Sequence, residues 1–266
     1  MRTLRTIEEA RAALPGDGVG LVPTMGALHA GHVALFGAAR RESEVVVASI
    51  FVNPAQFGAD EDFERYPRDG GADSAIAEAA GIDFLFVPSV EEMYPAGYET
   101  WVDVERISAG LEGAARPGHF RGVATVCLKL FNIVRPERAY FGQKDAQQAA
   151  VLERLVEDLN LDLEIRVVAT VRDEDGLAVS SRNAYLSADE RASALALPQA
   201  LTAGREAHAR GADPVEAARS ILTAEPGLEP DYVELAQLDG RLYLLAAARA
   251  GHTRLIDNVV LEGDPL

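Results

Sequence analysis

Two histidines, His29 and His32, lie three residues apart in the segment GVGLVPTMGALHAGH, residues 18–32. The apolar residues 19–22 before them are typical of a buried strand, and the helical spacing from Gly31 onward predicts a helix. The histidines therefore lie at a strand-to-helix junction, where backbone N–H groups and the helix dipole favour an anion. Because residues three apart on a helix share a face, both imidazoles could donate hydrogen bonds to one anionic ligand.

Three further polar segments also follow predicted strands: FVNPAQF, YFGQKDAQQ and VRDEDGLAVSSRN. Their candidate side chains are, in chain order, Asn53 and Gln56, then Lys144 and Gln148, then Ser180, Ser181 and Arg182. Ligands of open parallel sheets bind at the carboxyl ends of the strands, so we expect the four segments to meet at one edge. Ammonium, guanidinium, hydroxyl and imidazole groups together suit a chain of phosphates.

Each segment taken alone has a structural alternative. A histidine near a turn can satisfy a backbone group, Asn-Pro can form a turn, a lysine can lie on the surface, and Ser-Ser-Arg-Asn can cap a helix. Other nucleotide sites are excluded, because the sequence contains neither a P-loop motif nor G-x-G-x-x-G after the first strand. It also contains no serine elbow and no obvious histidine metal site, and the single cysteine, Cys127, is predicted to be a buried structural thiol.

The elements that must position these side chains alternate along the first two-thirds of the chain. Beyond the first strand and helix, the patterns predict strands at 44–52, 82–87, 138–142 and 162–170, and helices at 71–81, 121–134 and 145–160. Strands that alternate with helices predict an α/β fold with a doubly wound parallel sheet.

Beyond about residue 175 the pattern changes. A long helix is predicted over 187–211, with Ser187 and Glu190 as a capping box and a kink or break at Pro198. A second helix should begin at Asp213-Pro214, and strands are predicted at 231–238 and 253–261. These elements predict a smaller α+β domain that closes over the first.

Composition limits the class of protein and its partners. The 266 residues are 48% hydrophobic and 25% charged, which is typical of a soluble globular chain of one or two domains. No apolar run is long enough to span a bilayer, and acidic residues interrupt the N-terminal segment where a signal peptide would be apolar, so we expect a cytoplasmic protein without a membrane partner. The net charge of −17 and the lack of a basic run indicate that nucleic acid is not a partner.

The segment HAGH resembles the His-x-Gly-His signature of the nucleotidyltransferase superfamily. Together with PTMGALHAGH, FVNPAQF, RYPRD, LEGAARPGHFRGVATVCLKLFNIV, YFGQKDAQQ, DGLAVSSRNAYLS and RLIDNV, the chain resembles the pantoate–beta-alanine ligase family over nearly its whole length. The resemblance implies a Rossmann-like domain over residues 1–172, a C-terminal lid domain over 173–266, and a homodimer. It further implies that ATP and Mg²⁺ join pantoate to beta-alanine through a pantoyl adenylate.

The resemblance also implies roles for individual residues. His32, His29, Lys144 and Arg182 would be catalytic. The ATP site would comprise Met25, Gly26, Ala27, Leu28, His29, Ala30, Gly31, His32, Gly142, Gln143, Lys144, Asp145, Val171, Val179, Ser180, Ser181 and Arg182. Gln56, Gln148 and Asn53 would bind pantoate, and Gln56 would also contact beta-alanine. Val179 departs from the methionine common in the family, which leaves an apolar wall but alters its shape.

The residues that would hold magnesium stay open at this stage. Asp69 or Asp73 could help to hold magnesium, and neither is assigned.

The helix that begins near His32 should direct this ring outward while Val33 and Leu35 pack inward. The rival functions are another nucleotidyltransferase, such as one that adenylates a phosphorylated pantetheine or charges tRNA, and a non-catalytic nucleotide-binding or sensor protein of the same fold. AMP release that requires both pantoate and beta-alanine would separate the three functions.

Overall fold

The chain divides into two compact units. A computed structural model describes residues 1–59 and 61–263. Residues 1–142 and 147–168 form the first unit, and residues 143–146 with those from 169 onward form the second. Within these described residues, no helix combines the length and the apolar character that crossing a membrane requires. The predicted division of the chain at residue 172 stays a prediction.

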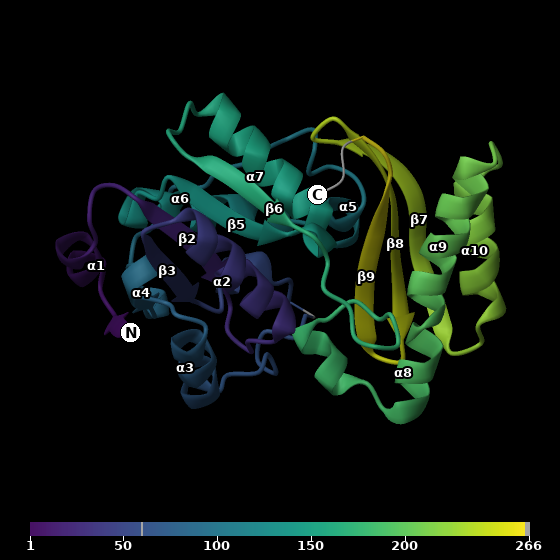
Figure 1. Ribbon diagram of the computed structural model, residues 1–266, viewed down its shortest axis with the longest axis horizontal. Coiled ribbons are helices and arrows are strands. Elements are labelled where there is room, and N and C mark those ends of the chain that lie inside the picture. Colours follow the sequence, from purple (N-terminus) through teal and green to yellow (C-terminus); the bar gives the residue numbers. More distant parts are fainter. Residues whose placement is uncertain (60, 264–266) are drawn as a thin grey trace. The chain divides into compact units, whose positions relative to one another are not determined.

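The first unit contains a six-stranded parallel sheet among its described residues, with the strand order β1-β4-β3-β2-β5-β6 (Figure 1). The strands, in chain order, are β1 (Arg2–Leu4), β2 (Val19–Thr24), β3 (Val45–Ile50), β4 (Phe84–Phe86), β5 (Arg138–Gly142) and β6 (Glu164–Val168). Each neighbouring pair is parallel. The chain order reverses between β2 and β5, so the predicted doubly wound sheet is confirmed, and β2 ends at the switch point where ligands of such sheets bind.

Helices cover both faces of this sheet (Figure 1). They are α1 (Ile7–Ala13), α2 (Ala30–Glu42), α3 (Gly70–Ala79), α4 (Val90–Met93), α5 (Glu112–Ala115), α6 (His119–Val134) and α7 (Ala146–Asp158), with the 3₁₀ helix η1 (Pro54–Gln56). Side chains alternate along each strand, so Leu21 packs with α6 while its neighbour Val22 packs with α2. Burial on both faces explains the continuous apolar runs of the strands.

The second unit is an antiparallel sheet backed by helices (Figure 1). Its elements are the 3₁₀ helices η2 (Gln143–Asp145) and η3 (Ser181–Tyr185), the helices α8 (Ala188–Ala194), α9 (Ala196–Ala209) and α10 (Pro214–Ala224), and the strands β7 (Leu228–Leu238), β8 (Arg241–Ala250) and β9 (Thr253–Glu262). β8 pairs with β7 on one side and β9 on the other. Leu197, Leu222 and Leu244 join α9, α10 and β8 in one core. The smaller α+β unit expected from the sequence is therefore confirmed.

The long helix predicted over 187–211 is two helices. Ser187 and Glu190 form the expected capping box at the start of α8, and the helix is interrupted at Leu195, where α8 ends and α9 begins. Pro198 lies in the first turn of α9, where its missing N–H removes one bond and its ring would collide with the carbonyl four residues earlier. The break therefore lies three residues before the proline that causes it.

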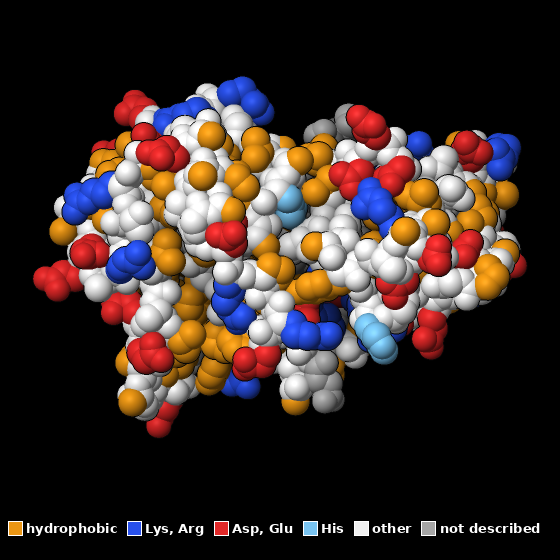
Figure 2. Space-filling view, turned by 90° about the horizontal axis from the view of Figure 1, so that it is seen from below, with side chains coloured by type: hydrophobic (Ala, Val, Ile, Leu, Met, Phe, Trp, Pro, Cys, Tyr) orange, Lys and Arg blue, Asp and Glu red, His pale blue; other side chains and the backbone are white. Residues whose placement is uncertain are grey.

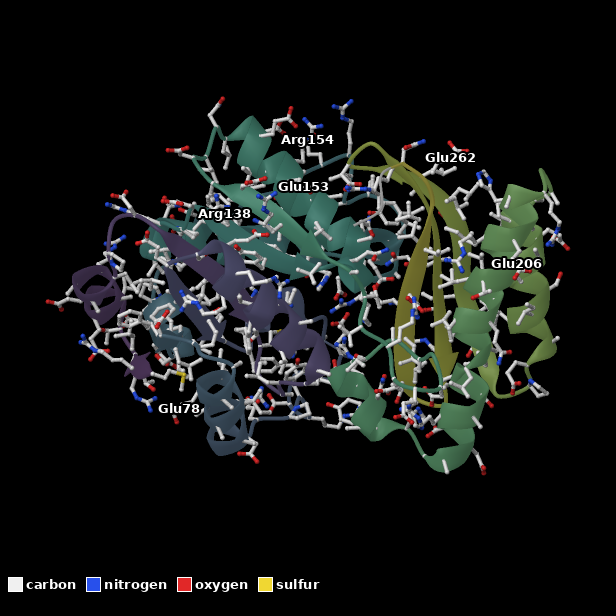
Figure 3. All side chains as sticks on the ribbon, viewed as in Figure 1. Glu78, Arg138, Glu153, Arg154, Glu206 and Glu262 are labelled. Atoms are coloured by element: carbon white, nitrogen blue, oxygen red, sulfur yellow. The ribbon has the colours of Figure 1, made fainter. Side chains whose placement is uncertain are left out.

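Charged side chains lie on the outer surfaces of both units. Glu78 on α3 and Arg154 on α7 are directed away from the sheet, and their side chains are 70% and 49% exposed (Figure 3). Acidic and basic side chains are interspersed on the face shown in Figure 2. The acidic side chains visible on that face therefore do not gather into one region.

Candidate active site

His29 and His32 occupy the junction between β2 and α2, as the sequence predicts. His29 is the N-cap of α2, and its Nδ1 atom accepts the N–H of Gly31 at 3.1 Å. The Nδ1 atom of His32 accepts the N–H of His29 at 3.2 Å, and the two ring centroids lie 4.1 Å apart. The pair therefore forms a reciprocal capping box in which imidazoles replace the usual hydroxyl and carboxylate.

These contacts determine which nitrogen of each ring carries a proton. An Nδ1 atom that accepts a backbone N–H must present its lone pair, so in the neutral imidazole the proton is on Nε2. Both rings are thereby fixed as Nε2–H donors. The anion expected at this junction would meet side-chain donors, because the backbone N–H groups of His29 and Gly31 already donate to the rings.

One predicted feature of this helix is wrong. Val33 is 43% exposed, whereas Leu35 is 9% exposed and packs into the core as expected. Val33 directly follows His32, and a step of one residue turns the helix by about 100°. The inward stripe of α2 is formed by Leu35, Phe36 and Ala39, and Val33 lies outside it.

Asn53 and Gln56 lie at η1, which follows β3 as the sequence predicts. The Asn53 side chain is 1% exposed: its Oδ1 accepts from the Tyr94 hydroxyl at 2.9 Å, and its Nδ2 donates to Gln56 Oε1 at 3.0 Å. Gln56 Nε2 in turn donates to the Met25 sulfur at 3.3 Å. The structure thus brings together Met25, Asn53 and Gln56, from the ends of β2 and β3. Asn53 orients the amide of Gln56 through these contacts.

Helix α6 packs closely against η1 through Gly122. A Cβ atom at this position would lie 2.3 Å from the carbonyl oxygen of Ala55, so only glycine fits. The carbonyl oxygen of Gly122 also accepts a hydrogen bond from Asn53 Nδ2 at 3.2 Å. The glycine of the segment FRGVATV therefore allows α6 to approach η1 closely and to hold the Asn53 side chain.

His119 and Arg116 support the Gln56 backbone. His119 Nδ1 lies 2.9 Å from the Gln56 carbonyl oxygen, and its Nε2 lies 3.0 Å from the Arg116 guanidinium, which also pairs with Glu61 at 2.7 Å. Since arginine has only donors, Nε2 accepts and Nδ1 carries the proton. Burial, together with the Arg116 charge, lowers the pKa of His119 to about 4.

This low pKa predicts how stability depends on pH. The ring is neutral in the folded state and charges more easily when unfolded, so its contribution is fully present above the ordinary histidine pKa of 6.5 and is lost as the pH falls toward 4. The full loss would be about 3 kcal/mol in the free energy of unfolding. Urea denaturation between pH 7.5 and 4.5 should show a shallower decline for His119→Gln than for the parent. His252→Gln, at an exposed histidine, is the control, and an identical decline in the parent and His119→Gln would contradict the assignment.

Lys144 lies in η2, within the second unit. The buried Asn258 on β9 donates from Nδ2 to the carbonyl oxygens of Gln143 and Lys144, both at 2.9 Å. The Lys144 side chain is 20% exposed, and its Nζ lies 3.9 Å from Asp145 Oδ1. A strand more than a hundred residues along the chain therefore fixes the backbone that carries the ammonium group.

The remaining predicted nucleotide residues lie on a small hairpin of the second unit. The N–H of Val179 donates to the Val171 carbonyl at 3.0 Å, so these two valines lie opposite each other. Ser180 then caps η3, with its Oγ accepting the N–H of Arg182 at 3.3 Å. Arg172 holds the hairpin to β9 through two hydrogen bonds to the buried Asp257, at 2.6 and 3.0 Å.

The comparisons decide between the possible families. Residues 1–260 match the pantoate–beta-alanine ligase family. The chain belongs to this family. Pantothenate synthetases of Chloroflexus aurantiacus and Roseiflexus castenholzii are 53% and 55% identical to it, over 99% and 98% of this chain and 99% and 100% of those relatives.

Solved structures of the family agree with this fold. A pantothenate synthetase from Thermus thermophilus is 49% identical, with a TM-score of 0.96 over 99% of this chain and 100% of that one. A pantoate–beta-alanine ligase from Francisella tularensis, complexed with beta-gamma ATP and beta-alanine, is 35% identical, with a TM-score of 0.84 over the full length of both chains. Membership of the ligase family makes the chain an enzyme of the pantothenate pathway.

The described residues do not form a cluster of metal ligands. Among them, no three His, Cys, Asp or Glu side chains gather closely enough to hold a metal ion. Asp69 caps α3, and Asp73 accepts the N–H groups of Ala27 at 3.0 Å and Leu28 at 2.7 Å.

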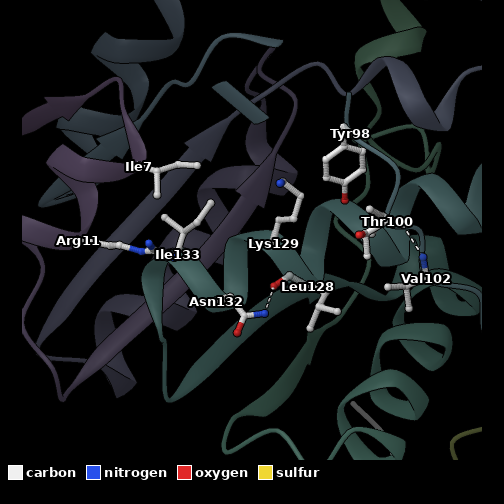
Figure 4. A pocket seen from close by; sticks show the side chains of 10 residues that line it. Ile7, Arg11, Tyr98, Thr100, Val102, Leu128, Lys129, Asn132 and Ile133 are labelled. Carbon is white, nitrogen blue, oxygen red and sulfur yellow. Dashed lines mark hydrogen bonds between the residues drawn. The ribbon is translucent and has the colours of Figure 1, made fainter. Parts of the chain in front are cut away.

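The first unit also contains a cavity, shown in Figure 4. Its volume is about 210 Å³, and α1, α6 and residues 98–102 line it. Lys129 projects into it, 4.6 Å from the Tyr98 ring centroid, and burial lowers the pKa of this lysine. None of the residues predicted to bind substrates lines this cavity.

Proposed function

We infer that this ligase condenses (R)-pantoate with beta-alanine, using ATP, to give pantothenate, AMP and pyrophosphate. Family membership over residues 1–260 supports these substrates. The observation that carries the chemistry is the histidine pair, whose Nδ1 atoms both accept backbone N–H groups. Two neutral rings held as Nε2–H donors suit phosphate oxygens on which negative charge develops. The product is the pantothenate used for coenzyme A.

In the first step, a carboxylate oxygen of pantoate attacks the α-phosphorus of ATP. The new P–O bond forms as the bond between the α-phosphorus and the bridging oxygen breaks, and pyrophosphate leaves. We propose that His29, His32, Lys144 and Arg182 stabilise the phosphate oxygens during this step. Catalysis then consists mainly of positioning and charge stabilisation, as in other phosphoryl and nucleotidyl transfers.

In the second step, the neutral amine of beta-alanine attacks the acyl carbon of pantoyl adenylate. The C–N bond forms, the bond between the acyl carbon and the AMP oxygen breaks, and the amine loses a proton. We propose that Gln56 contacts pantoate and beta-alanine, since Asn53 and Met25 fix its amide, and that Gln148 contacts pantoate. Asn53 assists by orienting Gln56, in addition to any contact of its own with pantoate.

The remaining nucleotide contacts are proposed from their positions. Residues 25–32, 142–145, Val171 and 179–182 would hold ATP. Magnesium would neutralise the phosphates of the bound nucleotide, and no dedicated protein cage is required for it. We further propose a cytoplasmic homodimer, without nucleic acid or membrane partners, in which residues 173–266 act as a lid over a nucleotide-binding and pantoate-binding domain at 1–172.

Pyrophosphate exchange tests this function. With pantoate, ATP and magnesium but no beta-alanine, the enzyme should incorporate labelled pyrophosphate into ATP, because the first step needs no amine. Omission of pantoate is the control and should abolish exchange. If exchange requires beta-alanine, the two-step route is wrong, and if no exchange or AMP release depends on pantoate, the substrate assignment is wrong.

A further inference from the structure

The carboxylate of Asp73 is buried against the turn that precedes the two histidines. Asp73 lies on α3 and is 3% exposed. Its Oδ2 accepts the N–H of Ala27 at 3.0 Å, and its Oδ1 accepts the N–H of Leu28 at 2.7 Å. Both carboxylate oxygens are therefore used by a segment 45 or 46 residues earlier in the chain.

The turn at residues 26–28 presents backbone N–H groups that need hydrogen-bond acceptors from outside the turn. Gly26 has φ +84° and Ala27 has φ +50°, two successive left-handed conformations, and the second is unfavourable for alanine. Successive N–H groups in such a turn converge into a concave anion site. Thr24 accepts the N–H of Gly26 at 3.2 Å, and the Asp73 carboxylate accepts the next two.

The fit of the carboxylate against the turn is close. A Cβ atom at Gly26 would lie 2.7 Å from Asp73 Oδ2, so residue 26 cannot carry a side chain without displacing the carboxylate. The turn ends one residue before His29, the N-cap of α2. Its conformation therefore sets where the helix begins and where the two imidazoles lie.

We propose that Asp73 is a positioning residue for adenylation: its carboxylate occupies the anion site of the turn at residues 26–28 and so fixes the Nε2–H donors of His29 and His32 toward ATP. This assignment rests on the function proposed above. Of the two roles that the sequence leaves open for Asp73, these contacts support positioning of the turn.

Asp73→Asn is the principal test. The amide keeps the size of the carboxylate but turns an NH₂ group toward one of the two N–H donors, so the turn loses a partner. We expect kcat for pantoate-dependent pyrophosphate exchange to fall about tenfold, because misplacement of catalytic groups affects the transition state most. The KM for ATP and the magnesium concentration at half-maximal rate should stay within about twofold, since neither ground-state binding nor the metal is the target.

A rescue variant makes the test specific to the turn. Glycine adopts left-handed conformations readily, so Ala27→Gly should reduce the need for the Asp73 contact. In the Asp73→Asn background, Ala27→Gly should recover part of the lost kcat, by about threefold or more. This double variant also replaces Asp73→Asn if the single variant does not fold.

Asp69→Ala is the matched control on the same helix. Asp69 also accepts two backbone N–H groups, of Gly71 and Ala72, but both belong to α3 itself. This variant should melt a few degrees earlier than the parent and retain its kcat.

Three results would overturn the proposal. They are an unchanged kcat in Asp73→Asn, a rate restored by excess magnesium, and a double variant no faster than the single one. Loss of pantoate-dependent exchange in the parent enzyme would instead refute the proposed function, so the two failures are distinguishable.

Discussion

Replacing Lys144 with alanine should slow adenylation by about a hundredfold or more, as loss of one transition-state donor typically does. The ammonium group lies in η2, directly after β5, and is proposed to meet the ATP phosphates. Asn258 holds this segment through the backbone carbonyls of Gln143 and Lys144, which an alanine retains. The fold should therefore survive the change while kcat for pyrophosphate exchange falls.

The chain offers a matched control, because it contains only two lysines. Lys129 lines the cavity between α1 and α6, and its ammonium lies over the Tyr98 ring. Lys129→Ala should leave the exchange rate unchanged, which excludes a general effect of removing one positive charge. A Lys144→Ala enzyme with normal turnover and an unchanged KM for ATP would show that Lys144 is a surface lysine.

The sequence predicts the central strands of the first unit well because they are buried on both faces, whereas the edge strand β1, with two of its three residues exposed, is missed. Strands such as 138–142 read as short apolar runs bounded by polar residues, and helices such as α6 show clear amphipathic spacing. The same alternation brings the polar segments to the ends of their strands. The positions of His29 and Gln56 therefore follow from local pattern and parallel topology together.

The prediction misses β8 because its residues favour another structure. The segment RLYLLAAARA is rich in alanine and leucine, which are strong helix formers, and its pairing with β7 and β9 overrides this preference. Helix α9 packs closely on this strand: a Cβ atom at Gly204 would lie 2.3 Å from the Leu244 side chain. The feature of the sequence that indicates this strand is Asp239-Gly240. Both residues have left-handed backbone conformations and form a two-residue hairpin turn between β7 and β8.

The supporting contacts of the site could not be predicted from local pattern. Asp73 contacts Ala27 across 46 residues, and Asn258 contacts Lys144 across 114. Neither residue follows one of the four polar segments, and a buried carboxylate and a surface one look alike in a sequence. Both residues do lie within or beside family motifs, RYPRD and RLIDNV, which mark a constraint without stating its physical cause.

Replacing His32 with asparagine should lower turnover by about a hundredfold or more while ATP still binds. The Nε2–H donor of His32 is proposed to strengthen its hydrogen bond as charge grows on the departing pyrophosphate, so its loss affects the transition state more than the ground state. An asparagine oxygen can still accept the N–H of His29, which is the structural contact made by Nδ1. The melting temperature should therefore stay within a few degrees of the parent's.

A second capping box in the same unit separates the chemical role from the structural one. Thr6 and Glu9 make the same reciprocal contacts at the start of α1. Thr6→Ala should lower stability by about 1 kcal/mol and leave turnover unchanged, because it removes a cap without removing a donor to ATP. If His32→Asn instead behaves like Thr6→Ala, with early melting and normal turnover of the folded enzyme, His32 serves only to begin α2. The expected opposite, normal melting with slow turnover, requires that its Nε2 proton meets the substrate.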